Sequence, residues 1–194
     1  MSNSHFFAML SRMKFINRWG LMHNTVEENI SEHSLQTAMF THCMILMHND
    51  MYDDNLDAEH GAILALYHDT SEIITGDLPT PVKYYNPDIR EAYKKVEAYA
   101  EDRLISLLPE NLQKYYTNII HYSEQDEKLW KYVKAADKIS AITKCIEEIK
   151  IGNTEFSDAY NSLTESVKEL NMPVADKFFE EFIPSFQLTL DKLK

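Results

Sequence analysis

The stretch YHDTSE, residues 67–72, contains a histidine followed directly by an aspartate, His68 and Asp69. A neutral imidazole and a carboxylate are both good ligands for a divalent metal of borderline softness. One such pair is weak evidence, because the two residue types adjoin by chance in many helices. The sequence also contains His33 in SEHSL upstream and Asp137 in AADK downstream. Together these residues have the ligand content of a hydrolytic metal site.

The composition is that of an ordinary globular domain. The chain has 194 residues, of which 44% are hydrophobic and 26% charged. This length suits one sizeable core, so we expect residues 1–194 to form a single domain. The sequence lacks an apolar run of membrane-spanning length and a signal-peptide pattern, so we expect a cytoplasmic protein with no membrane partner. Cys43 and Cys145 have no metal-type spacing, which favours free thiols in a reducing compartment.

The chain is strongly acidic, with a formal net charge of −12. A nucleic-acid polymer needs a basic protein surface against its phosphate backbone, so the charge argues against such a partner. A small anionic substrate stays compatible with this charge if a metal ion and a few cationic side chains are concentrated at one site.

Helical periodicity runs through almost the whole sequence and strand-type alternation is not evident, so the predicted fold is all-α. Asn29 resembles the cap of a helix that continues to about residue 49. Asp57 begins the next predicted helix, which carries the His-Asp pair and ends near Gly76. Two prolines exclude residues 77–82 from regular helix. Further helices are predicted to begin near Asn86, Pro109, Ser123, Asn153 and Pro173, and the one that begins at Ser123 is long and runs to Gly152.

The long predicted helix is apolar on two sides. One stripe at helical spacing consists of Ala135, Ile139, Ile142, Ile146 and Ile149. Asp137 falls on the opposite side, beside Trp130, Val133, Ser140 and Ala141. Such a helix lies centrally in a bundle, so Asp137 is predicted to be buried or to line a cavity. A buried carboxylate needs a cation, a metal or strong donors, and the alternative to a metal here is a salt bridge to a lysine or arginine.

Glu72 is a candidate for acid–base chemistry. It lies four residues after His68 and three after Asp69, so it shares their face of the predicted helix. A carboxylate in that place could orient a ligand or act as a general acid or base beside a metal-bound water. The alternative is an ordinary surface glutamate.

Arg18 and Trp19 form a second unusual spot. The arginine offers a planar fork of donors suited to phosphate, and the indole can wall a ring-shaped substrate. A packing or interface role is the commoner one for such a pair taken alone. The loop of residues 77–82 is stiffened by its prolines, which would present the side chains of Asp77 and Thr80 at fixed positions.

Several stretches, in order along nearly the whole chain, resemble one family. They include NRW (residues 17–19), ENISEHSLQ (28–36), YHDTSEIITGDLPTPVKY (67–84), AADK (135–138) and GNTEF (152–156). The His-Asp doublet with His33 and Asp137 resembles the metal set of the HD-domain phosphohydrolases. The TGDLPTPVKY run and the upstream NRW narrow the resemblance to the bacterial 5′-deoxynucleotidases of that superfamily. Ile142 is a departure, because family members often carry an aromatic residue there.

The resemblance implies a single-domain HD-type helical bundle and a homodimer. It implies one divalent metal ion, whose ligands are His33, His68, Asp69 and Asp137. Two imidazoles and two carboxylates suit cobalt, manganese, iron or zinc. The implied substrate is a deoxyribonucleoside 5′-monophosphate, contacted at its phosphate by Arg18 and at its sugar by Trp19. Further substrate contacts are implied for Asp69, Asp77, Leu78, Pro79, Thr80 and Asp137.

The implied reaction is metal-assisted attack of water on phosphorus, which releases a deoxyribonucleoside and phosphate. Phosphomonoesters hydrolyse extremely slowly without a catalyst, and a metal both activates water and polarises a phosphoryl oxygen. We hypothesise that Glu72 orients or deprotonates the water and that Arg18 neutralises phosphoryl charge. Glu72 and Asp77 are both candidates to protonate the departing 5′ oxygen. Trp19 is the natural side chain to exclude a 2′-hydroxyl.

Two other readings stay open on the sequence alone. The superfamily also supports hydrolysis of triphosphates, cyclic nucleotides and alarmones, which the doublet cannot separate. A triphosphate would call for several basic residues, whereas the site region offers Arg18, Lys83 and Lys138. The second alternative is a helical module that binds a nucleotide or a structural metal without catalysis, because four protein ligands can satisfy a tetrahedral ion. A structural ion would need neither Glu72 nor Arg18.

Overall fold

The computed structural model describes residues 4–83 and 85–193, with Thr80 described by its backbone alone. Apart from an isolated bridge between Asn17 and Asn29, the described residues form no β-structure, which confirms the all-α prediction. The α-helices are α1 (Phe6–Leu10), α2 (Ile30–Tyr52), α3 (Ala58–Tyr67), α4 (Glu72–Thr75), α5 (Thr80–Lys83), α6 (Pro87–Ile105), α7 (Glu110–Ile120), α8 (Glu127–Lys150), α9 (Ser157–Lys168) and α10 (Pro173–Phe182). Short 3₁₀ segments are η1 (Ser11–Phe15), η2 (Glu124–Asp126), η3 (Thr154–Phe156), η4 (Ile183–Gln187) and η5 (Leu190–Lys192).

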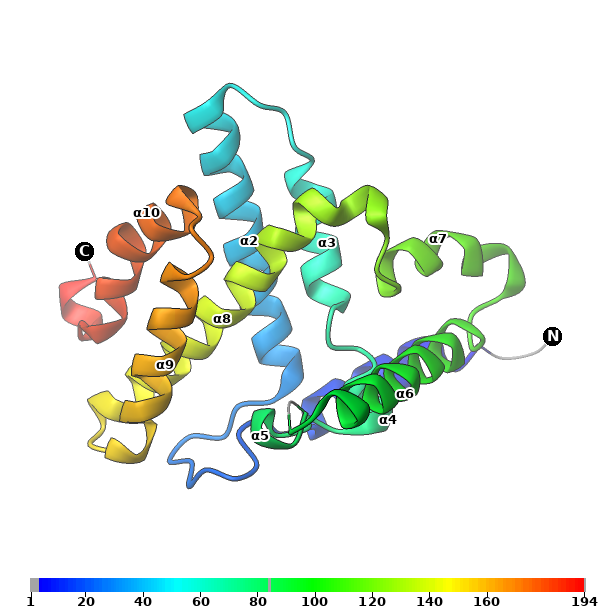
Figure 1. The fold of residues 1–194 in the computed structure, drawn as a ribbon, viewed down its shortest axis with the longest axis horizontal. Coiled ribbons are helices and arrows are strands. Elements are labelled where there is room, and N and C mark those ends of the chain that lie inside the picture. Colours follow the sequence, from blue (N-terminus) through cyan, green and yellow to red (C-terminus); the bar gives the residue numbers. More distant parts are fainter. Residues whose placement is uncertain (1–3, 84, 194) are drawn as a thin grey trace.

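Helix α8 crosses the middle of the molecule and organises the bundle around it (Figure 1). It packs against α2 and α3 on one side and against α9 and α10 along its C-terminal half. Helices α4, α5 and α6 gather below this group together with α1, and α7 extends to one side. In the described chain, no helix is both long and apolar enough to cross a membrane.

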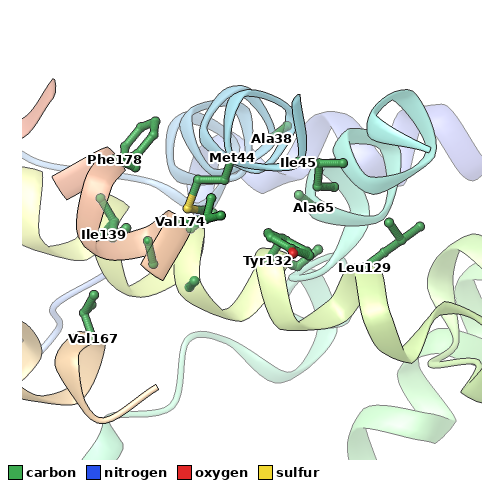
Figure 2. Close-up of a cluster of buried hydrophobic side chains, with 14 of the residues drawn as sticks. Ala38, Met44, Ile45, Ala65, Leu129, Tyr132, Ile139, Val167, Val174 and Phe178 are labelled. Carbon is green, nitrogen blue, oxygen red and sulfur yellow. The ribbon is translucent and has the colours of Figure 1, made fainter. Parts of the chain in front are cut away.

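The main core lies where α2, α3, α8, α9 and α10 meet (Figure 2). The predicted apolar stripe of α8 is confirmed for Ala135, Ile139, Ile142 and Ile146, which are at most 4% exposed. It is wrong for Ile149, which lies in the last turn of α8 and is 36% exposed. Ile142, the departure from the family pattern, is fully buried in this core.

The helix starts follow the capping residues in the sequence. The Asn29 side chain accepts hydrogen bonds from the backbone amides of Ser31 and Glu32 at the start of α2. Asp57 accepts from the amide of His60 at the start of α3, and Asn86 does the same at the start of α6. These contacts satisfy amides that have no partner within the helix. Asn29 therefore fixes the first turn of the helix that carries His33.

The predicted helix from Asp57 to Gly76 is wrong in its second half. Helix α3 ends at Tyr67, a turn follows, and α4 is a separate single turn that Gly76 ends with φ +73°. At this break a side chain donates a hydrogen bond to a backbone carbonyl of the last helical turn: Thr70 Oγ1 donates to the Tyr67 carbonyl at 2.8 Å. Such local side-chain bonds compete with helix continuation. His68 and Asp69 therefore lie in a turn, and the shared helix face with Glu72 does not exist.

The proline-containing loop is shorter than predicted. Residues 77–79 are irregular, but the one-turn helix α5 begins at Thr80 and includes Pro81 and Val82. A proline is tolerated in the first helical turn, where its missing amide would have no helical partner. The amides of Val82 and Lys83 both donate to the Pro79 carbonyl, which anchors this turn to the end of the loop.

Candidate active site

The four predicted metal ligands come together from three parts of the fold. His33 lies on α2, His68 and Asp69 lie in the turn after α3, and Asp137 lies on α8. Ligand atoms of His33, His68 and Asp69 all lie within 4.8 Å of one another. His33 Nε2 is 3.6 Å from Asp69 Oδ2 and 3.0 Å from Asp137 Oδ1, and His68 Nε2 is 3.2 Å from Asp69 Oδ2. Asp137 thus joins the group through His33.

Hydrogen bonds on the far side of each imidazole orient both rings. His68 Nδ1 is 2.7 Å from the Ala65 carbonyl, which can only accept. His33 Nδ1 is 3.1 Å from Ser140 Oγ, whose own hydrogen is directed to Gln36 at 2.7 Å, so the serine oxygen accepts from His33. Both rings therefore turn Nε2 toward the carboxylates. This arrangement is typical of metal-binding histidines, whose second nitrogen is held by an acceptor.

The ligand atoms that face one another in this group favour a bound cation. The His68 Nε2 atom is buried, and because its 3.2 Å contact with Asp69 Oδ2 lacks hydrogen-bond geometry, it has no hydrogen-bond partner among the described residues. The His33 Nε2 atom lies 3.0 Å from Asp137 Oδ1, so an imidazole nitrogen and a carboxylate oxygen face the same space. Both atoms are of the type that binds a divalent ion. The residues present therefore fit a divalent metal.

Asp137 is not buried, which excludes one of the two settings predicted for it, burial or the lining of a cavity. Its side chain is 42% exposed, so it lines the open side of the group and is not buried. Partial desolvation raises the pKa of this carboxyl, but the hydrogen bond with His33 and the charges of His33, His68 and Arg18 lower it by more. The net effect holds the pKa of Asp137 well below its usual range, which keeps the carboxylate charged and able to bind a cation.

Arg18 and Trp19 lie in the loop between η1 and α2 and share one anchor. Arg18 Nη1 and Trp19 Nε1 each donate to the same oxygen, Glu28 Oε2, at 2.9 Å. Burial lowers the pKa of Arg18, but the negative charges of Glu28, Asp137, Asp69 and Asp77 raise it, so the guanidinium stays charged. Arg18 is therefore a fixed positive charge that interacts with the metal ligands.

Glu72 is a buried carboxyl at the edge of the metal group. It is 8% exposed, and its Oε2 atom has no hydrogen-bond partner among the described residues. Burial, followed by the negative charges of Asp69 and Asp77, raises the pKa of Glu72 to about 10. A carboxyl with so high a pKa accepts and holds a proton far more readily than a surface glutamate. The surface reading of Glu72 is therefore wrong.

The loop after α4 contributes a second carboxyl with an altered pKa. Burial raises the pKa of Asp77, while the charge of Arg18 and a hydrogen bond from the Trp19 backbone amide lower it, and the net shift is upward. Leu78 and Pro79 are half-buried in the same loop. The side chain of Thr80 lies outside the described part, so its predicted substrate contact cannot be placed. No described contact joins Leu78 or Pro79 to the metal group, and their role stays a prediction.

Three residues that orient the site have no role predicted from the sequence. Glu28 anchors Arg18 and Trp19, and Ser140 with Gln36 orients the His33 ring. Gln36 follows His33 by three residues, so helical spacing alone places it on the same face of α2. Glu28 had no comparable signal, because loop residues have no fixed period.

Other histidines have carboxylate partners that do not belong to the metal group. His48 pairs with Asp54, His60 with Asp126, and His121 with both Glu101 and Asp102.

A buried ion pair underlies the loop that carries Arg18 and Trp19. Glu148 of α8 is fully buried and accepts hydrogen bonds from the backbone amides of Thr25 and Val26. Lys144, one turn earlier, donates to Glu148 and to the Val26 carbonyl. Asn153 Nδ2 also donates to Glu148, at 2.8 Å. These contacts tie the far end of the loop to the central helix.

Comparison with known proteins shows the family of this chain. A family model described as 5′-deoxynucleotidase YfbR-like matches residues 5–186. The chain is 49% identical to a 5′-deoxynucleotidase of Vibrio atlanticus over 193 residues, covering 100% of both proteins. It is 48% identical to a 5′-deoxynucleotidase of Erwinia tasmaniensis, covering 100% of this chain and 98% of that protein.

Solved structures share the fold. An HD-domain phosphohydrolase from Listeria innocua has a TM-score of 0.81 at 25% identity and covers 94% of this chain and 88% of its own. A cyanophage S-2L HD phosphohydrolase, solved with dA and one catalytic zinc ion, has a TM-score of 0.66 at 21% identity, with coverage of 94% and 96%. The latter likeness concerns the fold alone. The chain belongs to the YfbR-like 5′-deoxynucleotidase family of HD-domain phosphohydrolases.

Proposed function

We propose that this protein is a metal-dependent 5′-deoxynucleotidase, which hydrolyses deoxyribonucleoside 5′-monophosphates to deoxyribonucleosides and phosphate. The observation that carries the proposal is the convergence of His33, His68, Asp69 and Asp137 beside a fixed arginine, in a chain of this family. The test is phosphate release from a deoxynucleotide by metal-stripped protein to which single divalent metals are returned.

His33, His68, Asp69 and Asp137 would hold one divalent ion. Such an ion supplies Lewis acidity, which lowers the pKa of water at the site to about 7 and withdraws charge from a phosphoryl oxygen. Mixed nitrogen and oxygen ligands are compatible with cobalt, manganese, iron or zinc. Metal-stripped protein should be inactive, and restored turnover with each added metal would rank these ions.

The remaining residues would each have a separate role in phosphate-ester hydrolysis. Arg18 would bind the phosphate and neutralise charge that develops on its oxygens. Glu72 would take the proton from the attacking water once the positive charge of a bound metal ion has lowered its pKa from the raised value of the metal-free protein. Asp77, whose pKa is also raised, would hold a proton for the departing 5′ oxygen. Asp69, Asp137, Leu78, Pro79 and Thr80 would contact the substrate around these groups.

Trp19 would select deoxyribose by filling the space that a 2′-hydroxyl needs. Replacing it with alanine is therefore expected to raise kcat/KM for a ribonucleoside 5′-monophosphate relative to the deoxy substrate. Steric exclusion of one small group in a pocket is worth roughly 10- to 100-fold, so the ratio should fall by about that factor. The measurement is the ratio of kcat/KM for dAMP and AMP.

Phe15 offers a matched control for this substitution. It is an aromatic residue near Trp19 in sequence, is 63% exposed and has the cations of Arg12 and Lys14 over its ring. Phe15→Ala should leave the ratio unchanged. A Trp19→Ala protein with the wild-type ratio would remove Trp19 from sugar selection.

We further propose a cytoplasmic homodimer. Leu35, Met39 and Leu46 lie on α2 and are 51%, 59% and 48% exposed, which is unusual for large apolar side chains on one helix. Burial between two copies would remove them from water. The free state of Cys43 and Cys145 fits a reducing compartment. Light scattering of wild type and Met39→Glu tests the dimer, and cell fractionation tests the location.

A further inference from the structure

Glu28 joins the two side chains that would bind opposite parts of the substrate. We propose that Glu28 is a positioning residue that couples phosphate binding by Arg18 to sugar selection by Trp19. One oxygen, Oε2, accepts from both side chains at 2.9 Å, so neither can shift without disturbing the other. The proposal rests on the 5′-deoxynucleotidase function proposed above and adds a specificity residue to it.

Backbone contacts fix Glu28 in place. The amide of Arg18 donates to the Glu28 carbonyl at 2.9 Å, and Asn17 pairs with Asn29 in an isolated β-bridge. The amide of Ile30 also donates to the carbonyl of Ile16 at 3.0 Å, which holds the two ends of the loop together. Glu28 therefore stands at the closed end of the loop, next to the first turn of α2. A carboxylate on so firmly held a backbone can determine where the Arg18 and Trp19 side chains lie.

Trp19 needs such an anchor because its backbone is strained. Its φ is +61°, in the left-handed region that is strained for a non-glycine residue. Its carbonyl accepts from the Met22 amide and from Asn24, and its ring lies 5.3 Å from that of Phe156. These contacts hold the main chain and one face of the ring. The hydrogen bond with Glu28 fixes the remaining freedom, the direction of the indole edge.

Arg18 needs the anchor for an electrostatic reason. Besides Glu28, it is attracted by Asp69, Asp77 and Asp137. Without Glu28, these carboxylates would draw the guanidinium onto the metal ligands and away from a phosphate. The side chains of Arg18 and Glu28 are each 13% exposed, so water screens the attraction between Arg18 and these carboxylates only in part. Glu28 thus opposes a collapse of Arg18 into the metal group.

Replacement of Glu28 should therefore change two properties at once. Glu28→Ala is expected to raise KM for dAMP and to lower the dAMP-to-AMP ratio of kcat/KM, each by roughly tenfold or more, as for loss of charge-assisted hydrogen bonds. Glu28→Gln keeps an accepting oxygen but no charge, so it should lie between wild type and Glu28→Ala. Arg18→Lys should raise KM for dAMP with little change in the dAMP-to-AMP ratio of kcat/KM. Trp19→Ala should lower that ratio with little change in KM for dAMP.

A spectroscopic readout separates positioning from catalysis. Trp19 and Trp130 are the two tryptophans of the chain, so a Trp130→Phe background leaves Trp19 as the only indole fluorophore. Loss of Glu28 in that background should lower the fluorescence anisotropy of Trp19, because the indole gains mobility. The neighbouring Glu27 is exposed and gives the matched control: Glu27→Gln should change neither kinetics nor anisotropy.

The outcomes distinguish this inference from the function on which it rests. Wild-type protein that is inactive on deoxynucleotides with metal returned would overturn the proposed function. An active wild type whose Glu28→Ala and Glu28→Gln variants keep the wild-type ratio and Trp19 anisotropy would overturn the coupling role alone. Thermal unfolding checks that each variant is folded, and Glu28→Gln carries the test if the alanine variant is not.

Discussion

Replacing Glu72 with glutamine is expected to lower kcat for dAMP by about 100- to 10,000-fold, the usual contribution of a general acid or base. Glutamine has nearly the same shape but cannot take a proton from water. The Oε2 atom of Glu72 has no hydrogen-bond partner among the described residues, so its replacement by the amide nitrogen of glutamine should leave packing intact. Metal content and KM should stay close to wild type. The measurement is steady-state kinetics with metal content determined in parallel.

Glu59→Gln is a suitable control, because Glu59 is an exposed glutamate in the first turn of α3. It should keep wild-type turnover. A Glu72→Gln protein that binds metal and turns over normally would show that another group accepts the proton.

The same variant gives a stability test with a defined sign. In the metal-free protein, burial and the charges of Asp69 and Asp77 raise the pKa of Glu72 from 4.5 to about 10. Unfolding returns the carboxyl to water and to its ordinary pKa, so the unfolded chain holds fewer protons between these values. The stability contributed by this group is therefore greatest below the ordinary pKa and is lost as pH rises toward about 10.

Urea unfolding of EDTA-treated protein measures this effect. Between about pH 5 and pH 9, wild type should lose stability relative to Glu72→Gln, because the glutamine cannot titrate. Parallel stability curves for the two proteins would show that Glu72 ionises normally in the folded state.

Removing one partner of the buried Lys144–Glu148 pair is expected to destabilise the protein by about 3–5 kcal/mol. The two side chains are 3% and 0% exposed, so Lys144→Met leaves the Glu148 charge buried without its cation. Glu148→Ala in turn leaves the amides of Thr25 and Val26 without their acceptor. Urea unfolding at neutral pH measures the loss.

Acidification should weaken the same contact. Burial raises the pKa of Glu148, but hydrogen bonds from Lys144, Val26, Asn153 and Thr25 lower it by more, to well below its usual range. Stability from this group is thus present above the ordinary pKa and is lost as pH falls below it. Glu147, its exposed neighbour, supplies the control: Glu147→Gln should cost less than about 0.5 kcal/mol. Equal losses for Glu147→Gln and Glu148→Ala would contradict the role of the pair.

The sequence predicts those parts of the fold that depend on local rules. Asn29, Asp57 and Asn86 cap their helices as expected, because a cap needs only the residue and the amides that follow it. The end of α3 at Tyr67 was not predictable in this way. His68 and Thr70 bond to carbonyls of the preceding turn, and the tertiary setting decides whether such side chains end a helix.

The metal ligands were predictable in kind, and their convergence was not derivable from the residues alone. His33 and Asp137 are 104 residues apart, and only the packing of α2 against α8 brings their atoms to 3.0 Å. The resemblance to a known family supplied that pairing. Neither the residue pattern nor the family resemblance predicted the role proposed for Glu28. That role depends on a loop whose closure is visible only in three dimensions.

The most direct test is phosphate release from dAMP and AMP by metal-stripped protein, with single divalent metals added back. The expected result is metal-dependent release from dAMP with much slower release from AMP. Protein that binds metal yet releases phosphate from neither would contradict the proposed function. It would point to another phosphorylated substrate or to a binding module, and the phosphate role of Arg18 would be the first assignment to abandon.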